Sequence, residues 1–162
     1  MYKKVLVPLD GSELAECVLP HVESIVKGCT VQNVVFLRVV EPVSLPIGSG
    51  SDGGYVFTEP DATQVRTKID SNNKKEAEQY LDQVLSQSKY GDVKAQSEVI
   101  IGKAAESIAD YATKNEVDLI IMASHGRSGI SKWVLGSVAE RIAHSTCAPV
   151  LMVRAPGCVP GI

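Results

Sequence analysis

The sequence predicts a doubly wound α/β domain: a five-stranded parallel sheet with helices on both faces. Short apolar segments alternate with longer segments whose apolar residues recur at helical spacing, and this alternation is typical of βαβ units with right-handed crossovers. Two segments, residues 5–9 and 119–122, are wholly apolar, as expected of central strands buried on both faces. A length of 162 residues suits one domain, so we expect a single domain over residues 1–162.

The elements are expected in the order β-α-β-α-β-α-β-α-β. Strands are predicted at residues 5–9, 31–40, 93–101, 119–122 and 149–153. Helices are predicted at residues 14–26, 65–88, 103–115 and 137–145. Pro20 interrupts the first helix, because proline lacks an N–H and clashes with the preceding turn. The Gly- and Ser-rich residues 41–63 are too long and too polar for a tight connection, which predicts a flexible loop.

The pattern of each strand sets the expected order in the sheet. Residues 93–101 alternate between polar and apolar side chains, as in a half-exposed edge strand. With the two wholly apolar strands central and adjacent, the predicted order is 3-2-1-4-5. The winding then reverses between strands 1 and 4, and open α/β sheets bind ligands beyond the carboxyl ends of the strands at such a reversal. The loops from Pro8 to Ser12 and from Ala123 to Gly129 are expected to meet there.

The composition excludes several classes of protein. A net charge of −3 argues against a general nucleic-acid binder, which normally has a basic face. No apolar run approaches the ~20 residues of a membrane span, and the first run stops at Leu9, too early for a signal peptide. The four cysteines lack zinc-ligand spacing; Cys17 and His21 form at most half a metal site. We therefore expect reduced cysteines and a cytoplasmic location.

The segment after the fourth strand has the features of a phosphate-binding loop. Gly126 and Gly129 permit a tight turn whose N–H groups converge on an anion, and Gly136 permits close backbone approach. Ser137 and Glu140 have the spacing of a capping box, which predicts a helix beginning at Ser137. The free N–H groups and the dipole of a helix N-terminus favour phosphate. The spacing alone leaves a capped helix without a ligand equally open.

These residues resemble the signature of the universal stress protein family. Ala123 and Gly126 are followed by nine residues and then by Gly136 and Ser137, and nucleotide-binding members of that family carry Gly-x2-Gly-x9-Gly-(Ser/Thr) after the fourth strand. The stretches from Pro8 to Ser12 and from Ala148 to Val153 also resemble the family. The resemblance covers almost the whole chain and implies a Rossmann-like fold. The one departure is Ala123, which stands where the signature has its first glycine.

The resemblance implies an adenine-nucleotide site between the first and fourth strands. Asp10 would contact the ribose or adenine, and the backbone of Val39 would meet the adenine edge. Met122 and Ala123 would line the pocket. The phosphates would be held by Gly126, Arg127, Gly136, Ser137 and Val138. The full predicted site is Pro8, Leu9, Asp10, Val39, Met122, Ala123, His125, Gly126, Arg127, Gly129, Gly136, Ser137, Val138 and Ala139. Simpler roles also remain open: Asp10 as a helix cap, Met122 as core and Arg127 as a solvated charge.

The leading functional hypothesis is a cytoplasmic stress-response regulator that binds ATP, ADP or AMP, with or without Mg²⁺. One alternative is a slow nucleotide hydrolase or nucleotidyl-transfer enzyme. Against it, the sequence has no GxSxG nucleophile elbow, and only Asp10 is an obvious carboxylate in the predicted crevice; we assign no catalytic or metal-binding residue. A third hypothesis is a nucleotide-free dimeric module that binds a partner. The apolar edge strand from Pro149 to Val153 predicts a homodimer through pairing of identical strands, which the resemblance also implies.

Overall fold

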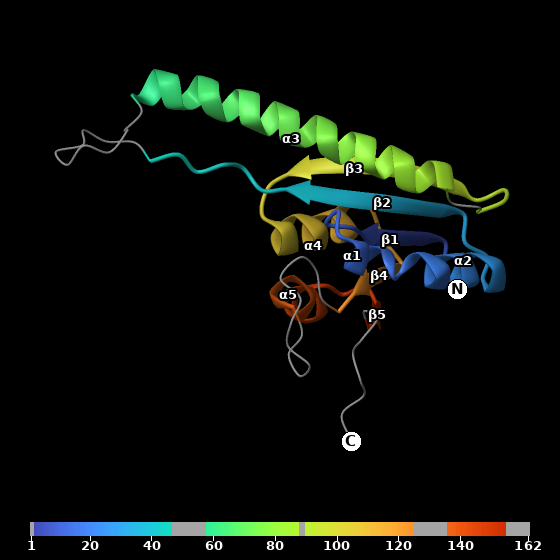
Figure 1. Cartoon of the computed structure of the whole chain (residues 1–162). Coiled ribbons are helices and arrows are strands. Elements are labelled where there is room, and N and C mark those ends of the chain that lie inside the picture. The colour runs from blue at the N-terminus through green and yellow to red at the C-terminus, as the bar shows by residue number, and fades with distance from the viewer. Residues whose placement is uncertain (1, 47–57, 88–89, 125–135, 155–162) are drawn as a thin grey trace.

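The computed structural model describes residues 2–46, 58–87, 90–124 and 136–154. Its strands are β1 (Lys4–Pro8), β2 (Asn33–Val40), β3 (Lys94–Ile101), β4 (Leu119–Ala123) and β5 (Val150–Val153). Its helices are α1 (Glu13–Glu16), α2 (Leu19–Gly28), α3 (Glu59–Gln87), α4 (Ala104–Lys114) and α5 (Ser137–Ser145). The strands form one parallel sheet in the order β3-β2-β1-β4-β5 (Figure 1). The predicted fold class and strand order are confirmed.

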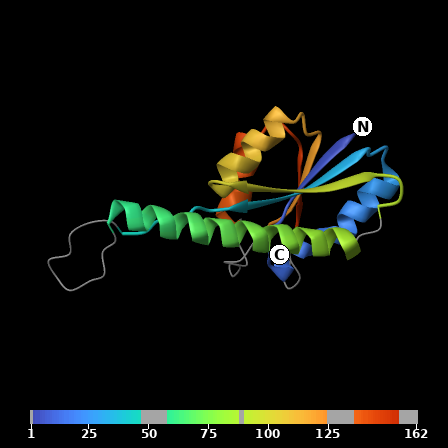
Figure 2. The ribbon, with the colours of Figure 1, turned by 90° about the horizontal axis from the view of Figure 1, so that it is seen from above.

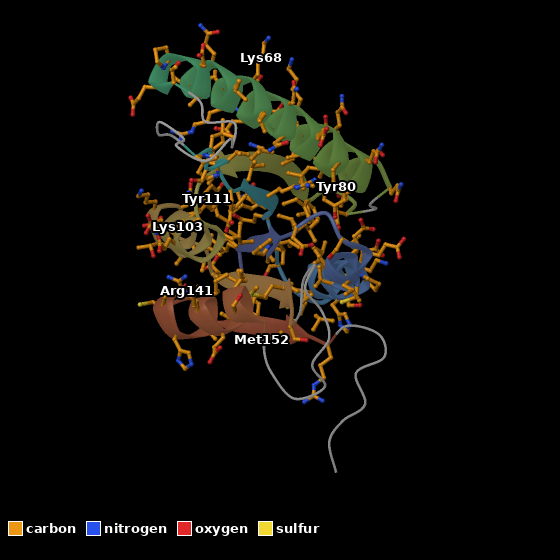
Figure 3. All side chains as sticks on the ribbon, turned by 60° about the vertical axis from the view of Figure 1, so that its left-hand side comes forward. Lys68, Tyr80, Lys103, Tyr111, Arg141 and Met152 are labelled. Atoms are coloured by element: carbon orange, nitrogen blue, oxygen red, sulfur yellow. The ribbon has the colours of Figure 1, made fainter. Side chains whose placement is uncertain are left out.

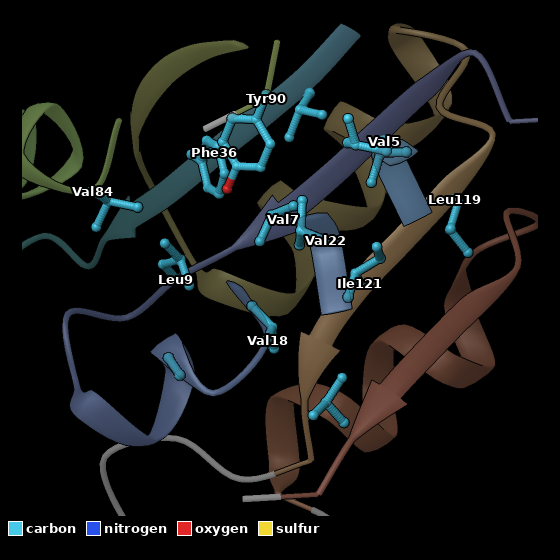
Figure 4. Packing of buried hydrophobic residues seen from close by; sticks show 14 of the residues in the cluster. Val5, Val7, Leu9, Val18, Val22, Phe36, Val84, Tyr90, Leu119 and Ile121 are labelled. Carbon is cyan, nitrogen blue, oxygen red and sulfur yellow. The ribbon is translucent and has the colours of Figure 1, made fainter. Parts of the chain in front are cut away.

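Helices cover both faces of the sheet because its central strands are apolar on both. On β1, Val5 and Val7 belong to the core shared with α1, α2 and α3, whereas Leu6, between them, belongs to the core shared with α4 and α5. Figure 2 shows α4 on one side of the sheet and α2 and α3 on the other. Figure 4 shows Val18 and Val22, which belong to the core shared with α1, α2 and α3, directed at β1 and β4. Since successive side chains of a strand point to opposite faces, a wholly apolar run fills both cores.

The interruption expected at Pro20 separates two helices. Helix α1 ends at Glu16, and α2 begins at Leu19 with Pro20 in its first turn. A proline is tolerated there because the N–H groups of the first turn have no partner inside the helix. The break therefore falls just before the proline, and the interruption predicted within residues 14–26 divides them into two helices.

Helix α3 begins six residues earlier than the predicted start at residue 65. Thr58 precedes the helix, its carbonyl accepts a hydrogen bond from Ala62 N at 2.9 Å, and its hydroxyl donates to Asp61 Oδ2 at 2.6 Å. Pro60 occupies the first turn, where proline fits. Residues 59–63 thus belong to α3, and the predicted loop 41–63 is too long at that end. Residues 47–57 of that loop lie outside the described residues.

The described part of the predicted loop, residues 41–46, is attached to α3. Val43 N donates to Asp70 Oδ1 at 3.3 Å, and Arg66 Nη2 donates to the carbonyl oxygen of Leu45 at 3.1 Å. The amino-terminal part of α3 extends beyond the sheet together with this segment (Figures 1 and 2). The carboxyl half of α3 packs on the sheet through Leu81 and Val84, so the same helix borders the space beyond the strand ends.

Asp118 fastens the amino end of β1 to the turn that precedes β4. Its Oδ2 accepts hydrogen bonds from the backbone N of Lys4 at 2.8 Å and of Lys3 at 2.9 Å. The backbone hydrogen bonds from Lys4 and then Lys3 lower the pKa of Asp118 below its ordinary value. The contact lies at the end of the sheet opposite to the ligand-binding end that the topology predicts.

We expect Asp118→Ala to lower the free energy of unfolding at pH 7 by less than about 1 kcal/mol, because solvent screens an exposed carboxylate. A group whose pKa is lowered by folding stabilises the folded state above its unfolded pKa of ~3.9, and that contribution is lost as the pH falls through the lower, folded pKa. Urea denaturation of wild type and variant between pH 7 and pH 2.5 tests this. A difference that grows on acidification would contradict it.

Within the described ranges, no helix combines the length and apolarity needed to cross a membrane.

Candidate functional site

A cavity of about 600 Å³ opens beyond the carboxyl ends of β1, β2 and β4, where the winding of the sheet reverses. Its wall includes every described member of the predicted site: Pro8, Leu9, Asp10, Val39, Met122, Ala123, Gly136, Ser137, Val138 and Ala139. The other predicted residues, His125, Gly126, Arg127 and Gly129, lie outside the described residues. The cavity is within the size range of small-molecule sites.

The carboxylate of Asp10 organises the turn between β1 and α1. Asp10 Oδ1 accepts hydrogen bonds from the backbone N of Ser12 at 3.0 Å and from its hydroxyl at 2.6 Å. Ser12 Oγ in turn accepts from Ala15 N at 3.2 Å, which makes Ser12 the N-cap of α1. The interpretation of Asp10 as the cap is therefore wrong. Its half-buried side chain stays at the cavity wall.

Backbone hydrogen bonds hold the start of α5 against the end of β4. Ser124 N donates to the carbonyl oxygen of Val153 at 2.8 Å, and Gly136 N donates to the carbonyl oxygen of Ser124 at 2.9 Å. Ser124 is buried. Because β4 ends at Ala123, the first turn of α5 lies directly beyond the carboxyl end of this central strand.

The N-cap of α5 is Gly136 rather than Ser137. Gly136 is extended, with φ −60° and ψ 142°, and its carbonyl accepts from Glu140 N at 2.9 Å. Ser137 is already helical, and no side chain makes a capping hydrogen bond, so the predicted capping box is wrong. The first-turn N–H groups of Ser137, Val138 and Ala139 have no acceptor inside the helix. They carry its partial positive charge at the wall of the cavity.

Several wall residues were missed by the sequence reasoning. They come from α1, β2, the segment after it, α3, α4 and the position after β4: Ala15, Leu37, Arg38, Val40, Glu41, Asn73, Glu76, Ala104, Ile108 and Ser124. Arg38 carried a signal, since it is the one charged residue in the apolar run of β2. Asn73 and Glu76 gave no such signal in the sequence, because polar residues on a helix are ordinarily solvated.

The guanidinium of Arg38 is held between a ring and a glycine. Its Cζ lies 5.0 Å from the centroid of the Tyr80 ring, and Tyr80 lies on α3 on the side toward the sheet (Figure 3). A Cβ at Gly11 would come within 2.9 Å of Arg38 Cζ, and Gly11 has φ +84°, a conformation that favours glycine. Burial, followed by the carboxylate of Glu16, raises the pKa of Tyr80, so its ring stays neutral at physiological pH.

A model of the universal stress protein family matches residues 1–154. The chain belongs to the universal stress protein family. A relative from Methanocaldococcus jannaschii, universal stress protein MJ0531, is 30% identical over 156 residues, which cover 96% of this chain and 84% of the relative.

Solved structures of similar proteins share the whole fold. The structure of MJ0577, whose sequence is that of a universal stress protein from the same organism, superposes with a TM-score of 0.78 at 27% identity and covers 97% of this chain and 99% of its own. A universal stress protein family protein from Arabidopsis thaliana, solved with AMP bound, has a TM-score of 0.60 at 14% identity and covers 96% of this chain and 93% of its own. This second likeness establishes the fold alone.

Acidic groups are present at the cavity but are not gathered. Asp10, Glu41 and Glu76 contribute carboxylates to its wall. Among the described residues, no three His, Cys, Asp or Glu side chains come together closely enough to hold a metal ion. The described wall therefore offers backbone N–H donors and one guanidinium as its positive groups.

Proposed function

We propose that this universal stress protein binds an adenine nucleotide in the cavity and acts as a cytoplasmic regulator whose signal is binding. The first turn of α5 carries the proposal: the N–H groups of Ser137, Val138 and Ala139, which have no acceptor inside the helix, belong to residues at the wall of a cavity at the topological switch point. Backbone donors of this kind suit phosphate. Gly136, without a side chain, lets phosphate oxygens approach them.

Other residues of the wall suit a nucleoside. Asp10 offers a carboxylate to ribose hydroxyls, the backbone of Val39 lies at the end of β2, and Met122 supplies apolar surface. The Arabidopsis family protein of the same fold was solved with AMP, which supports this choice of ligand. Ala123, buried at the end of β4, adds one methyl group where the family signature has glycine, a small change in the cavity wall.

Two measurements test whether the protein binds an adenine nucleotide. Mass spectrometry of the freshly purified, denatured protein is expected to detect AMP, ADP or ATP. Calorimetric titration of nucleotide-free protein with each of them, with and without Mg²⁺, is expected to give saturable binding at one site per chain. If neither a co-purified nor an added nucleotide binds, a nucleotide-free module that binds a partner becomes the better interpretation. Sustained hydrolysis of bound ATP would instead favour an enzyme.

We also propose that β5 forms a homodimer with the β5 of a second copy. The strand is last in the order of the described sheet, and Leu151 is 37% exposed on it. An apolar edge strand invites pairing with another chain, and a two-fold axis pairs identical strands in antiparallel fashion.

Leu151→Lys is expected to convert the dimer to a monomer, because a charged side chain on an edge strand opposes pairing. Sedimentation velocity at tens of micromolar measures the change. Ile101→Lys is the matched control, since Ile101 is an exposed aliphatic residue, 46% accessible, at the end of the opposite edge strand β3. A wild-type protein that sediments as a monomer would show that β5 does not form this interface.

A further inference from the structure

Arg38 is one of the residues that line the cavity, and its guanidinium packs against an aromatic ring and a glycine. Its Cζ lies 5.0 Å from the centroid of the Tyr80 ring, and Gly11 approaches it so closely that a Cβ there would lie 2.9–3.0 Å from Cζ and both terminal nitrogens. This packing leaves the edge of the guanidinium, through which it makes hydrogen bonds, for other partners. That edge carries N–H donors in a fork that matches two oxygens of one phosphate.

No described residue satisfies these donors. The ion pairs within the described ranges involve Lys27, Lys74, Lys103, Lys114 and Arg141, and no hydrogen bond joins Arg38 to a described acceptor. Arg38 is half-buried, and partial burial of a charge is unfavourable unless its donors are hydrogen-bonded. A guanidinium on a cavity-lining residue, packed on a ring and without an acceptor among the described residues, is the arrangement that an anionic ligand group would complete.

The position of Arg38 identifies the part of the ligand that it would meet. The guanidinium contacts Gly11, which directly follows Asp10, and both Asp10 and Arg38 line the cavity. Under the proposed function, Asp10 faces the ribose hydroxyls, so Arg38 lies beside them. In dinucleotide-binding folds, the ribose is met either by an acidic side chain, which binds a free hydroxyl, or by an arginine, which accommodates a phosphate on that ring.

We propose that Arg38 binds a phosphate carried by the ribose ring, so that the preferred ligand is an adenosine bisphosphate. Its 5′-phosphate would bind at the first turn of α5, and its 2′- or 3′-phosphate at Arg38. This inference rests on the proposed function and names the ligand class of the same site. Asp10, Glu41 and Glu76 also line the cavity. Glu41 and Glu76 are exposed, so water and salt screen their repulsion, and Asp10 Oδ1 already accepts two hydrogen bonds from Ser12.

Calorimetry with three ligands tests the inference: AMP, adenosine 2′,5′-bisphosphate and adenosine 3′,5′-bisphosphate. On the wild type, one bisphosphate is expected to bind on the order of ten- to a hundredfold more tightly than AMP, as a charge-assisted bidentate contact provides. The two bisphosphates distinguish a 2′ from a 3′ site. In Arg38→Met, which keeps an unbranched apolar side chain, the ratio of the two affinities is expected to fall to about one, since the fork that binds the phosphate is gone.

The ratio of bisphosphate affinity to AMP affinity, measured on one variant, distinguishes loss of phosphate binding by Arg38 from loss of the fold, because misfolding would weaken both ligands. Lys94→Met removes an exposed cation at the amino end of β3, away from the cavity, and is expected to keep the wild-type ratio. Tyr80→Phe keeps the ring that orients Arg38 and should keep the ratio, whereas Tyr80→Ala should reduce it. A wild type that binds AMP but prefers neither bisphosphate overturns this inference and leaves the proposed function intact. A preference that survives Arg38→Met also overturns it, and failure of all three ligands together with ADP and ATP overturns both.

Discussion

Phe36→Ala is expected to lower the free energy of unfolding by about 3–5 kcal/mol, the range for truncating a buried aromatic residue. Phe36 lies in the middle of β2 and is fully buried, with 0% of its surface exposed. Its ring centroid is 5.7 Å from that of Tyr90 at an interplanar angle of 34° (Figure 4). Truncation removes this contact and leaves a void between the sheet and α3 that rigid strands cannot fill by collapse. Urea denaturation followed by circular dichroism measures the loss.

Two variants calibrate this effect. Ile101→Ala, at the 46% exposed end of β3, is expected to change stability by no more than about 0.5 kcal/mol, as is usual for surface substitutions. The loss of stability in Phe36→Leu should lie between those of Ile101→Ala and Phe36→Ala, because leucine keeps part of the buried volume. A Phe36→Ala protein within about 1 kcal/mol of wild type would contradict the packing described here, since core truncations of this size exceed that value.

The strands were predictable because burial on both faces leaves a plain signature. After the first residue of β1, neither β1 nor β4 contains a charged residue. This is expected because the central strands of a parallel sheet are buried on both faces and must be apolar on both. The half-exposed pattern of β3 placed it at an edge for the same reason. The strand order, and with it the position of the cavity, followed from these differences in polarity.

Helix ends were less predictable because they depend on single residues and their backbone angles. Pro60 lies where a loop was expected, yet proline is compatible with the first turn of a helix, and α3 begins at Glu59. Ser137 has the right spacing for a cap, but the hydrogen bond from Gly136 N to Ser124 O places Gly136 in the capping position. That hydrogen bond joins two residues that are twelve positions apart in the sequence, so a local sequence pattern cannot predict it.

The site was predictable where the chain itself adjoins the strand ends. Asp10 follows β1, and Ala123 is the last residue of β4. Because β1 and β4 are neighbours in the sheet, the strand order brings these two residues together. Asn73 and Glu76 reach the cavity only because α3 runs along the sheet and extends past the carboxyl ends of the strands. Helical periodicity in the sequence does not contain this tertiary relation. Arg38 stood out as a charge inside β2, but its stacking on Tyr80 depends on the packing of α3.

Gly136→Val is expected to reduce nucleotide affinity on the order of a hundredfold or more, because at least two charge-assisted backbone hydrogen bonds to phosphate would be lost. Gly136 lines the cavity immediately before the first-turn N–H groups of α5, so a branched side chain there would stand where phosphate oxygens must approach. Its φ of −60° and ψ of 142° are allowed for valine, so the fold should persist. Calorimetric titration with AMP and ATP measures the affinity, and circular dichroism checks the fold.

Matched variants separate obstruction of the phosphate from general damage. Gly28→Val adds the same side chain at the end of α2, where a Cβ meets no atom within 4 Å, and should bind as the wild type does. Ser137→Ala removes a hydroxyl but no helix cap, so it should not show the ~1 kcal/mol loss of stability that removal of a cap produces. Ala123→Gly, which restores the glycine of the family signature, should leave the affinity unchanged or raise it. If Gly136→Val binds AMP and ATP as tightly as Gly28→Val does, the phosphates lie elsewhere, and the first turn of α5 is only the start of a helix.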